Sequence, residues 1–220
     1  MSRIRAVALT LFAMLSALPA YAAAPAYSHL DFAFLSSEFK TDGSSVKNKA
    51  DGGRFNFNVS LERWLYFTGE YNHADFDTNN QQLRDTSLGF GAHTLKNNYQ
   101  FFGAGTYERT DTFGTNLTDE GFGIQAGVRA PFLERFEAQA DIKYLSFGDD
   151  ATTKKKVDFT RYRLTAQARL SPVWAFVGTY QLSDYDTGER TDWTAGFRAY
   201  FKTQYDVPQR KRPVESSGNK

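Results

Sequence analysis

One histidine and three aspartates are the residues whose types and spacing could support chemistry. His73 and Asp75 lie two residues apart, and Asp184 and Asp186 repeat that spacing further along the chain. A His–Asp pair could orient and polarise a water molecule for hydrolysis. The same aspartates are also common in turns, where their side chains hydrogen-bond the local backbone. The elements that carry these residues must decide between the two interpretations.

Other kinds of reactive site have little support. The chain has no cysteine, and its three histidines are scattered, so it offers neither thiol chemistry nor the ligand spacing of a metal site. Gly89-Phe90-Gly91 and Gly121-Phe122-Gly123 lie inside alternating segments, with no following helix whose N-terminus could hold a phosphate. We therefore expect no metal and no cofactor.

The first 22 residues have the pattern of a cleaved secretory signal. Arg3 and Arg5 precede the apolar run Ala6–Leu18, and Ala20-Tyr21-Ala22 is a small-x-small cleavage site. The apolar run is too short to span a bilayer. We expect the mature chain to start at Ala23.

The composition excludes a nucleic-acid partner. Lys and Arg number 26 against 25 Asp and Glu, which leaves no basic surplus for phosphate contacts. Aromatic residues make up 16% of the chain, although its mean hydropathy is −0.52. Apolar surface must therefore come from alternation rather than from continuous apolar runs.

Ten segments alternate between apolar and polar residues, as half-buried strands do. They lie at 27–38, 53–62, 64–74, 84–94, 98–109, 120–130, 135–147, 157–170, 173–184 and 191–201. Pro131 and Pro172 fall in connections, where the missing N–H harms no strand pairing.

The connections between these segments alternate in length. Long polar loops are expected at Phe39–Gly52, Asp75–Leu83, Thr110–Asp119, Gly148–Lys156 and Tyr185–Arg190. Tight turns are expected near Arg63, Lys96-Asn97, Pro131–Glu134 and Ser171-Pro172. An even strand number with long loops at one end is typical of outer-membrane barrels, and a Greek-key sandwich has no reason to alternate in this way. The sequence predicts an all-β fold, a ten-stranded antiparallel up-and-down transmembrane β-barrel over residues 23–201.

The two faces of the predicted strands differ in polarity. One face is apolar and ends in aromatic residues, which suits lipid and its interfaces. The other face carries charges of both signs, although Tyr66 and Phe102 interrupt it on the third and fifth segments. The predicted inward residues are Asp31, Arg54, Asn56, Asn58, Glu70, Asn72, Glu108, Gln125, Arg129, Glu137, Gln139, Asp141, Lys143, Arg161, Arg163, Gln167, Arg169 and Arg198.

Charges enclosed by a small barrel must pair, because an unpaired one costs several kcal/mol. Centring the seventh and eighth segments on Thr152 places Asp141 opposite Arg163, and the tight turn before the seventh segment brings Arg129 near Glu137. Both are predicted to be ion pairs. A small barrel filled in this way is plugged rather than open.

The final segment ends in Gly196-Phe197-Arg198-Ala199-Tyr200-Phe201. With the signal sequence, the strand number and the loop alternation, it resembles the bacterial outer-membrane β-barrel superfamily, the small OmpA/OmpX-like barrels. The resemblance implies a monomer in the cell outer membrane that contacts lipid and lipopolysaccharide. It also implies an assembly signal, carried by Gly196, Ala199 and Phe201, for the barrel-assembly machinery. The 19 residues after Phe201 depart from the family pattern, and 202–220 are predicted to be a disordered basic periplasmic tail.

Enzymes of this architecture are matched poorly. Omptin-like proteases resemble it in having ten strands and acidic residues with a His near the extracellular rim, but their motifs are absent and the loops are short. For lipid A-modifying barrels, His29 and His93 fall at the periplasmic ends, and His73 has no serine partner. We expect no enzymatic activity.

Two functions remain open. The first is a structural or surface-interaction role in envelope integrity or adhesion, through five extracellular loops. The second is a narrow passive channel for ions or small solutes. Lys154, Lys155 and Lys156 could contact lipopolysaccharide phosphates, or could form an ordinary solvated loop.

Overall fold

The computed structural model describes residues 28–43, 47–77, 82–96, 99–111, 118–133, 135–149, 156–186 and 188–202. Ten strands fill these ranges. They are β1 (His29–Thr41), β2 (Lys47–Ser60), β3 (Leu65–Phe76), β4 (Gln82–Lys96), β5 (Tyr99–Asp111), β6 (Thr118–Leu133), β7 (Phe136–Asp149), β8 (Lys156–Arg169), β9 (Trp174–Tyr185) and β10 (Gly188–Tyr200). Within the described ranges, no helix has the length and apolar character needed to cross a membrane.

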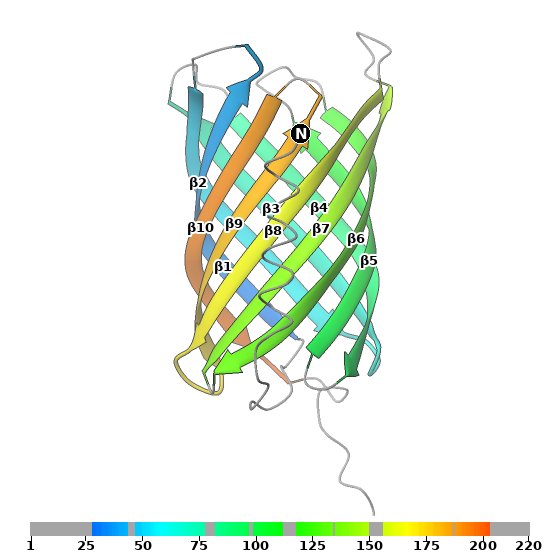
Figure 1. The fold of residues 1–220 in the computed structure, drawn as a ribbon, viewed down its shortest axis with the longest axis vertical. Helices are drawn as coiled ribbons and strands as arrows, with labels where there is room; N and C mark the ends of the chain where they lie inside the picture. The colour runs from blue at the N-terminus through cyan, green and yellow to red at the C-terminus, as the bar shows by residue number, and fades with distance from the viewer. Residues whose placement is uncertain are drawn as a thin grey trace, which may run out of the picture.

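The strands close into one antiparallel barrel in which neighbours in sequence are neighbours in space (Figure 1). β10 pairs with β9 on one side and with β1 on the other. The register between β1 and β10 runs from His29↔Tyr200 to Thr41↔Gly188. The ladder leaves the sheet without an edge, so the backbone groups of the wall are paired with each other. The predicted fold class, strand number and closing partners are confirmed.

The predicted long loops are wrong in extent, because the strands continue into them. β1 runs to Thr41 and β2 begins at Lys47, so only 42–46 remain of the predicted loop Phe39–Gly52. The other connections at this end, called the loop end below, shrink to 77–81, 112–117, 150–155 and 186–187. The opposite end, called the turn end, has short connections as predicted, at 61–64, 97–98, 134–135 and 170–173. The predicted placement of Pro131 in a connection is wrong, because β6 continues to Leu133 and Pro131 pairs with Glu137 next to an irregularity in the register.

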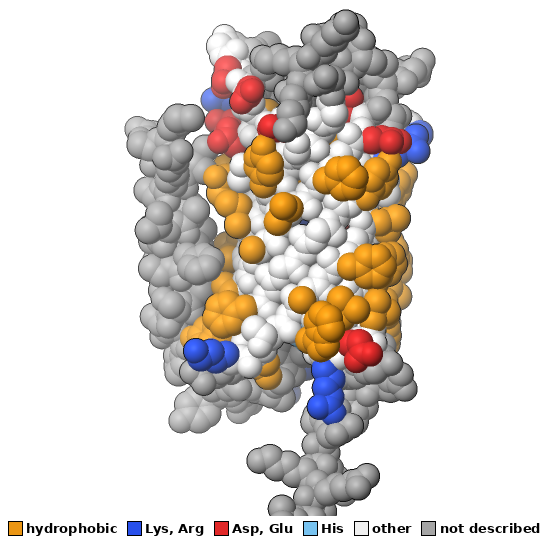
Figure 2. Space-filling view, turned by 90° about the vertical axis from the view of Figure 1, so that its right-hand side faces the viewer, with side chains coloured by type: hydrophobic (Ala, Val, Ile, Leu, Met, Phe, Trp, Pro, Cys, Tyr) orange, Lys and Arg blue, Asp and Glu red, His pale blue; other side chains and the backbone are white. Residues whose placement is uncertain are grey.

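The outward rows form an apolar belt around the wall. Figure 2 shows hydrophobic side chains over the middle of the barrel and charged side chains nearer its two ends. Such a belt is the surface that hydrocarbon requires. Its exposed members include Phe32, Phe34, Leu88, Phe90, Phe122, Ile124, Phe136, Ile142, Trp174, Phe176, Trp193 and Phe197.

The polarity of the two faces reverses at the loop end. There the inward residues are apolar and buried, in one cluster of Leu35, Phe39, Ala50, Ala74, Phe76 and Leu83 and a second of Leu145, Phe147 and Phe159, against which the partly buried Tyr185 packs. These two clusters form what we call the apolar cap. At the same height the outward residues are charged, among them Lys40, Lys49 and Asp75. The strand ends therefore have the polarity of a barrel that stands in water, which explains why they remain strands.

The two aromatic residues that interrupted the inward rows fill the lumen near the turn end. Tyr66 is 2% exposed and its ring lies over Gly91, where a Cβ would fall 2.3 Å from the ring. Phe102 lies over Gly127 in the same way, with a corresponding distance of 2.4 Å. Aromatic rings therefore occupy the space that glycines on neighbouring strands leave free.

Gly91→Ala is expected to destabilise the barrel by about 1–3 kcal/mol, because the added methyl group collides with the Tyr66 ring. Gly105→Ala is the matched control, since a Cβ there meets nothing within 4 Å. Urea unfolding in lipid vesicles, with the heat-induced gel shift as a check of folding, measures the difference. Equal effects of the two substitutions would contradict the packing described here.

Candidate functional site: the polar lumen

The seam between β1 and β10 is fastened by a bidentate ion pair. Arg198 donates from Nε and Nη2 to the two carboxylate oxygens of Asp31, both at 2.7 Å. The two residues are direct partners in the β1–β10 register, and both are buried. Ser37 donates to Asp192 at 2.7 Å further along the same seam. Two parallel hydrogen bonds to a carboxylate fix geometry as well as adding energy, so the closing strands are held in one register.

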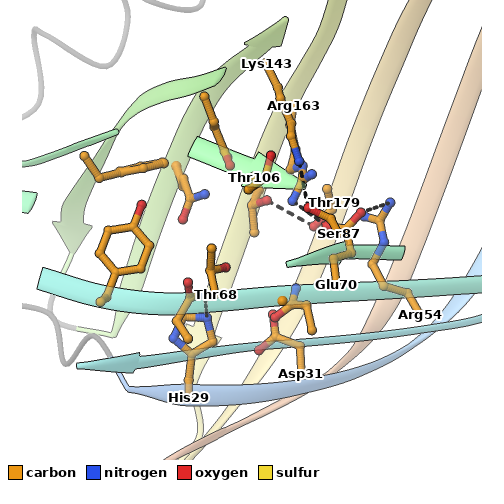
Figure 3. A pocket seen from close by; sticks show the side chains of 18 of the residues that line it. His29, Asp31, Arg54, Thr68, Glu70, Ser87, Thr106, Lys143, Arg163 and Thr179 are labelled. Carbon is orange, nitrogen blue, oxygen red and sulfur yellow. Dashed lines mark hydrogen bonds and ion pairs between the residues drawn. The ribbon is translucent and has the colours of Figure 1, made fainter. Parts of the chain in front are cut away.

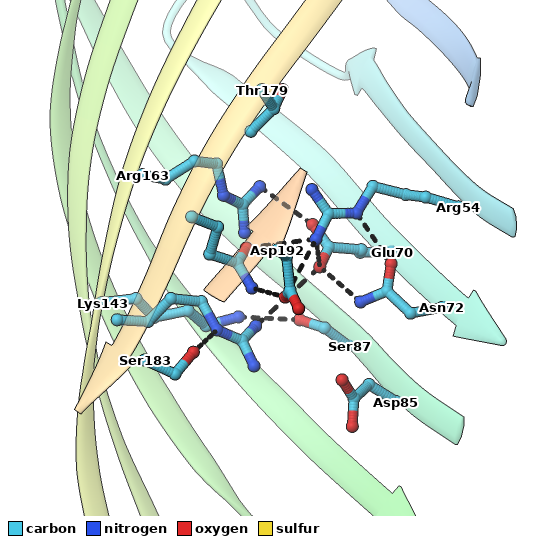
Figure 4. Close-up of polar contacts among 12 residues, drawn as sticks. Arg54, Glu70, Asn72, Asp85, Ser87, Lys143, Arg163, Thr179, Ser183 and Asp192 are labelled. Atoms are coloured by element: carbon cyan, nitrogen blue, oxygen red, sulfur yellow. Dashed lines mark hydrogen bonds and ion pairs between the residues drawn. The ribbon is translucent and has the colours of Figure 1, made fainter. Parts of the chain in front are cut away.

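Glu70 on β3 is the centre of the network (Figure 4). Arg163 on β8 approaches it to 2.9 Å, whereas Arg54 and Arg161 lie 3.7 and 3.8 Å from the same carboxylate. In the ring of ten strands β3 and β8 are five strands apart in either direction, so they form opposite walls. The Arg163–Glu70 pair therefore crosses the full width of the lumen.

Above this centre, Arg190 joins the network to the apolar cap. It donates from Nε to Asp192 at 2.7 Å and from Nη1 to Asp85 on β4 at 2.6 Å. Its guanidinium also lies 5.3 Å from the centre of the Phe39 ring. The cap and the charged layer are consequently one packed unit, and Arg190 is 1% exposed.

Lys143 on β7 closes the lumen from a third direction. Its ammonium lies 2.5 Å from Glu108 on β5 and donates to Ser87 Oγ on β4 at 3.0 Å. Ser87 in turn donates to Glu108 at 2.8 Å. Each charge is thus paired and hydrogen-bonded, as a buried ion pair must be to be tolerated.

Two arginines share one carboxylate at the turn end. Glu137 accepts from Arg129 Nε at 2.8 Å and from Arg169 Nε at 2.9 Å. Arg129 also donates to the Tyr200 hydroxyl on β10 at 3.0 Å. The lower lumen is bridged between β6, β7, β8 and β10.

A cavity of about 60 Å³ lies between these layers (Figure 3). A water molecule needs roughly 10–15 Å³ in this measure, so the cavity has room for a few. Its walls carry Arg54, Glu70, Lys143 and Arg163 above, with His29 and Asp31 on β1. No sugar or peptide fits in this volume.

Both ion pairs predicted from the sequence are present, but the Asp141–Arg163 pair is the longer of the two contacts that Arg163 makes with a carboxylate. Arg129 and Glu137 approach to 2.7 Å. Asp141 and Arg163 are register partners, yet their charged atoms lie 3.8 Å apart, because Arg163 turns across the lumen toward Glu70. Asp141 accepts hydrogen bonds from Gln125 and Gln139 instead.

Three members of the network were missed by sequence reasoning. Arg190 and the start of β10 were assigned to a loop, and Asp85 and Asp192 were not placed inward. Continuing the alternation of β10 backward from Arg198 reaches Asp192 and Arg190 on the same face, and that signal was available.

The residues proposed for assembly and for lipopolysaccharide contact occupy different places. Gly196 points inward, and a Cβ there would fall 2.0 Å from the Phe32 carbonyl oxygen, so the seam itself requires glycine. Ala199 is half-buried on β10, and Phe201 donates its backbone N–H to Ser28. Lys154 and Lys155 lie outside the described residues, and Lys156 is the first residue of β8.

The residues considered for hydrolysis do not converge. His73 Nε2 lies 3.9 Å from Asp75, and both side chains sit on the outward row of β3. Asp184 is exposed on the outward row of β9, four strands away around the ring. In the part of the chain that the structure describes, no three His, Asp or Glu side chains are grouped to hold a metal.

An edgeless wall with an apolar exterior and a charged interior defines a transmembrane β-barrel. A family described as outer membrane protein beta-barrel domain matches residues 6–165. The chain belongs to this family, and it is a protein of the bacterial outer membrane.

A comparison with solved structures finds matches at low sequence identity and low TM-score. The attachment invasion locus protein Ail of Yersinia pestis is 11% identical, with a TM-score of 0.38, and the match covers 80% of this chain and 99% of that one. The translocator domain of the autotransporter NalP from Neisseria meningitidis is 11% identical, with a TM-score of 0.47, over 90% and 97% of the two chains. No curated protein matches the chain in sequence.

Removal of either partner of the Arg163–Glu70 pair is expected to destabilise the barrel by about 3–5 kcal/mol, because the other charge is left buried. Glu70→Gln combined with Arg163→Gln should cost clearly less than the sum of the single changes. Unfolding of each variant in urea, followed by tryptophan fluorescence, gives the coupling energy.

The exposed pair of Glu38 and Lys47, 2.6 Å apart, is the control. Surface pairs of this kind contribute little, so the matching Gln variants should show no measurable coupling. Additive effects of the two substitutions would show that Glu70 and Arg163 do not interact across the lumen.

Proposed function

We propose that the barrel has a structural or surface-interaction role, in envelope integrity or adhesion, and does not conduct. The rigid wall would present its charged strand ends and five loops to the cell exterior. A partner could bind to these surfaces without any movement of the side chains that fill the lumen.

The Arg163–Glu70 contact carries the proposal. A 2.9 Å ion pair between opposite walls obstructs the lumen at its centre. Arg190 with Asp85 and the apolar cap form a second obstruction nearer the loop end. An ion would have to break several buried pairs in order to pass.

The absence of enzymatic activity is part of the same proposal. The outward placement of His73 and Asp75 supports it, because hydrolysis would need those groups to share a cleft with Asp184. Incubation of the purified barrel with casein, and separately with lipopolysaccharide, should leave both unchanged. A product that disappears with His73→Ala would overturn this part of the proposal.

The proposed partners are outer-membrane lipid, lipopolysaccharide through Lys154, Lys155 and Lys156, and the barrel-assembly machinery through Gly196, Ala199 and Phe201. The cations would offset lipid phosphates at the outer leaflet. The proposed state is a monomer, since one chain closes the wall.

Planar bilayer recordings test the closed lumen. The purified protein should give no stable, stepwise conductance, because the bridging side chains leave no continuous water path. A variant with Arg54, Glu70, Arg163 and Arg190 all changed to Ser and Phe39 changed to Ala weakens both the central bridge and the second obstruction, and should conduct more than the native chain.

The heat-induced gel shift identifies variants that have folded, so that the absence of conductance in a misfolded variant is not mistaken for a closed lumen. Stepwise conductance of the native protein would favour the alternative function, a narrow passive channel.

A further inference from the structure

The outward row of β5 lacks side chains in the middle of the apolar belt. Gly105 and Gly103 occupy two successive positions on this row, and a Cβ at Gly105 would meet nothing within 4 Å. Neither packing nor a positive φ therefore requires glycine at this position. The register places Phe90 on β4 and Ile124 on β6 on either side of Gly105, and both side chains are exposed. The lipid face thus has a groove one strand wide between two rows of hydrophobic side chains.

This groove, called the β5 groove below, runs along the outward row from Tyr107 through Gly105 and Gly103 to Phe101. Figure 2 looks onto the side of the barrel that carries β5 and β6 in Figure 1, and white surface there separates the hydrophobic side chains. Six residues of strand cover roughly 20 Å. With strands tilted by about 40°, this is about 15 Å along the membrane normal, or half of a hydrocarbon core about 30 Å thick. The groove is therefore as deep as one leaflet.

Two arginines stand directly beyond the loop end of the β5 groove. Arg109 is the next outward residue of β5 after Tyr107. Arg84 on β4 is its diagonal neighbour, since Arg109 pairs with Thr86. Both arginine side chains are exposed. Their guanidiniums thus lie where the apolar belt gives way to charged strand ends, which is the height of lipid headgroups.

Carboxylates also stand near these arginines, so the two positive charges are matched in number. Glu120 on β6 is the register partner of Arg109, and Asp111 on β5 is that of Arg84. Glu120 accepts a hydrogen bond from the Tyr107 hydroxyl, and among the described side chains it makes no ion pair with Arg109. The guanidinium of Arg109 therefore keeps its donors available for a group outside the chain.

We propose that the β5 groove binds one phosphorylated lipid of the outer leaflet, the lipid A part of lipopolysaccharide. The phosphate accepts hydrogen bonds from Arg84 and Arg109, and one acyl chain lies along Gly105 and Gly103. A phosphate suits guanidiniums, because each presents several donors in a fixed fork. The site rests on the proposed contact with lipopolysaccharide, but it lies on the wall of the barrel and does not use the three lysines named for that contact.

The test uses the full chain in detergent, with Lys154, Lys155 and Lys156 changed to Gln so that the wall is measured alone. Bisphosphorylated lipid A should raise the urea unfolding midpoint and saturate, because a ligand that binds only the folded state stabilises it. Inorganic phosphate should give no saturating rise, since it has no acyl chain. Lipid A without phosphates should need about tenfold more for half-maximal stabilisation, because hydrogen bonds to a charged group are lost.

Arg84→Gln combined with Arg109→Gln should raise the half-maximal concentration of lipid A about tenfold for the same reason. Gly105→Leu fills the groove and should also weaken binding, with the heat-induced gel shift as a check of folding. Lys47→Gln combined with Lys49→Gln, on the exposed outer row of β2, is the matched control and should leave the concentration unchanged. An unchanged value in either the arginine variant or the Gly105 variant would overturn the proposal.

The native chain separates this site from the proposed contact with lipopolysaccharide. If lipid A stabilises the native chain but not the chain without the three lysines, the contact stands and the wall site is wrong. If lipid A stabilises neither chain, both are wrong.

Discussion

The closure of β1 on β10 is the constraint on which the rest of the structure depends. In hydrocarbon an unpaired backbone group costs several kcal/mol, so a sheet with a free edge could not stand there. The seam meets this demand along its whole length, from His29 to Thr41. The Arg198–Asp31 pair and the missing side chain of Gly196 let the two strands approach in one register. The family resemblance assigns Gly196 to a signal for the assembly machinery. The structure gives it a local steric reason as well, because a side chain at this position would collide with the backbone of β1.

Closure creates the second problem, which is what fills the interior. Small barrels are filled by side chains, and here charged chains span distances that apolar ones could not bridge. Long arginine side chains from one wall reach carboxylates on another, while the rings of Tyr66 and Phe102 pack over glycines on neighbouring strands. The result is a layered interior, with aromatic rings at the turn end, charges in the middle and an apolar cap at the loop end.

The alternation in the sequence predicted the ten strands, their order and the inward face, because a period of two determines which side chains share a face. It also predicted that Arg129 would lie near Glu137, a contact across one hairpin. It could not predict the partner of Arg163. Register gives only neighbours along the sheet, whereas Glu70 lies on the opposite wall and depends on the curvature of the closed ring. The strand ends were mistaken for loops because their apolar residues lie on the opposite face from those in the membrane.

That reversal of polarity also sets the depth of the barrel in the bilayer. A wall with the same alternation along its whole length could slide along the membrane normal at little cost. Here a downward shift by one pair of residues would carry Glu38 and Lys49 toward hydrocarbon, where charges on the lipid face are destabilising. A shift in the opposite direction, toward the loop end, would carry Phe34 and Trp193 out of the hydrocarbon into water. The barrel is therefore matched to one bilayer thickness, and a thinner or thicker membrane would strain it or deform around it.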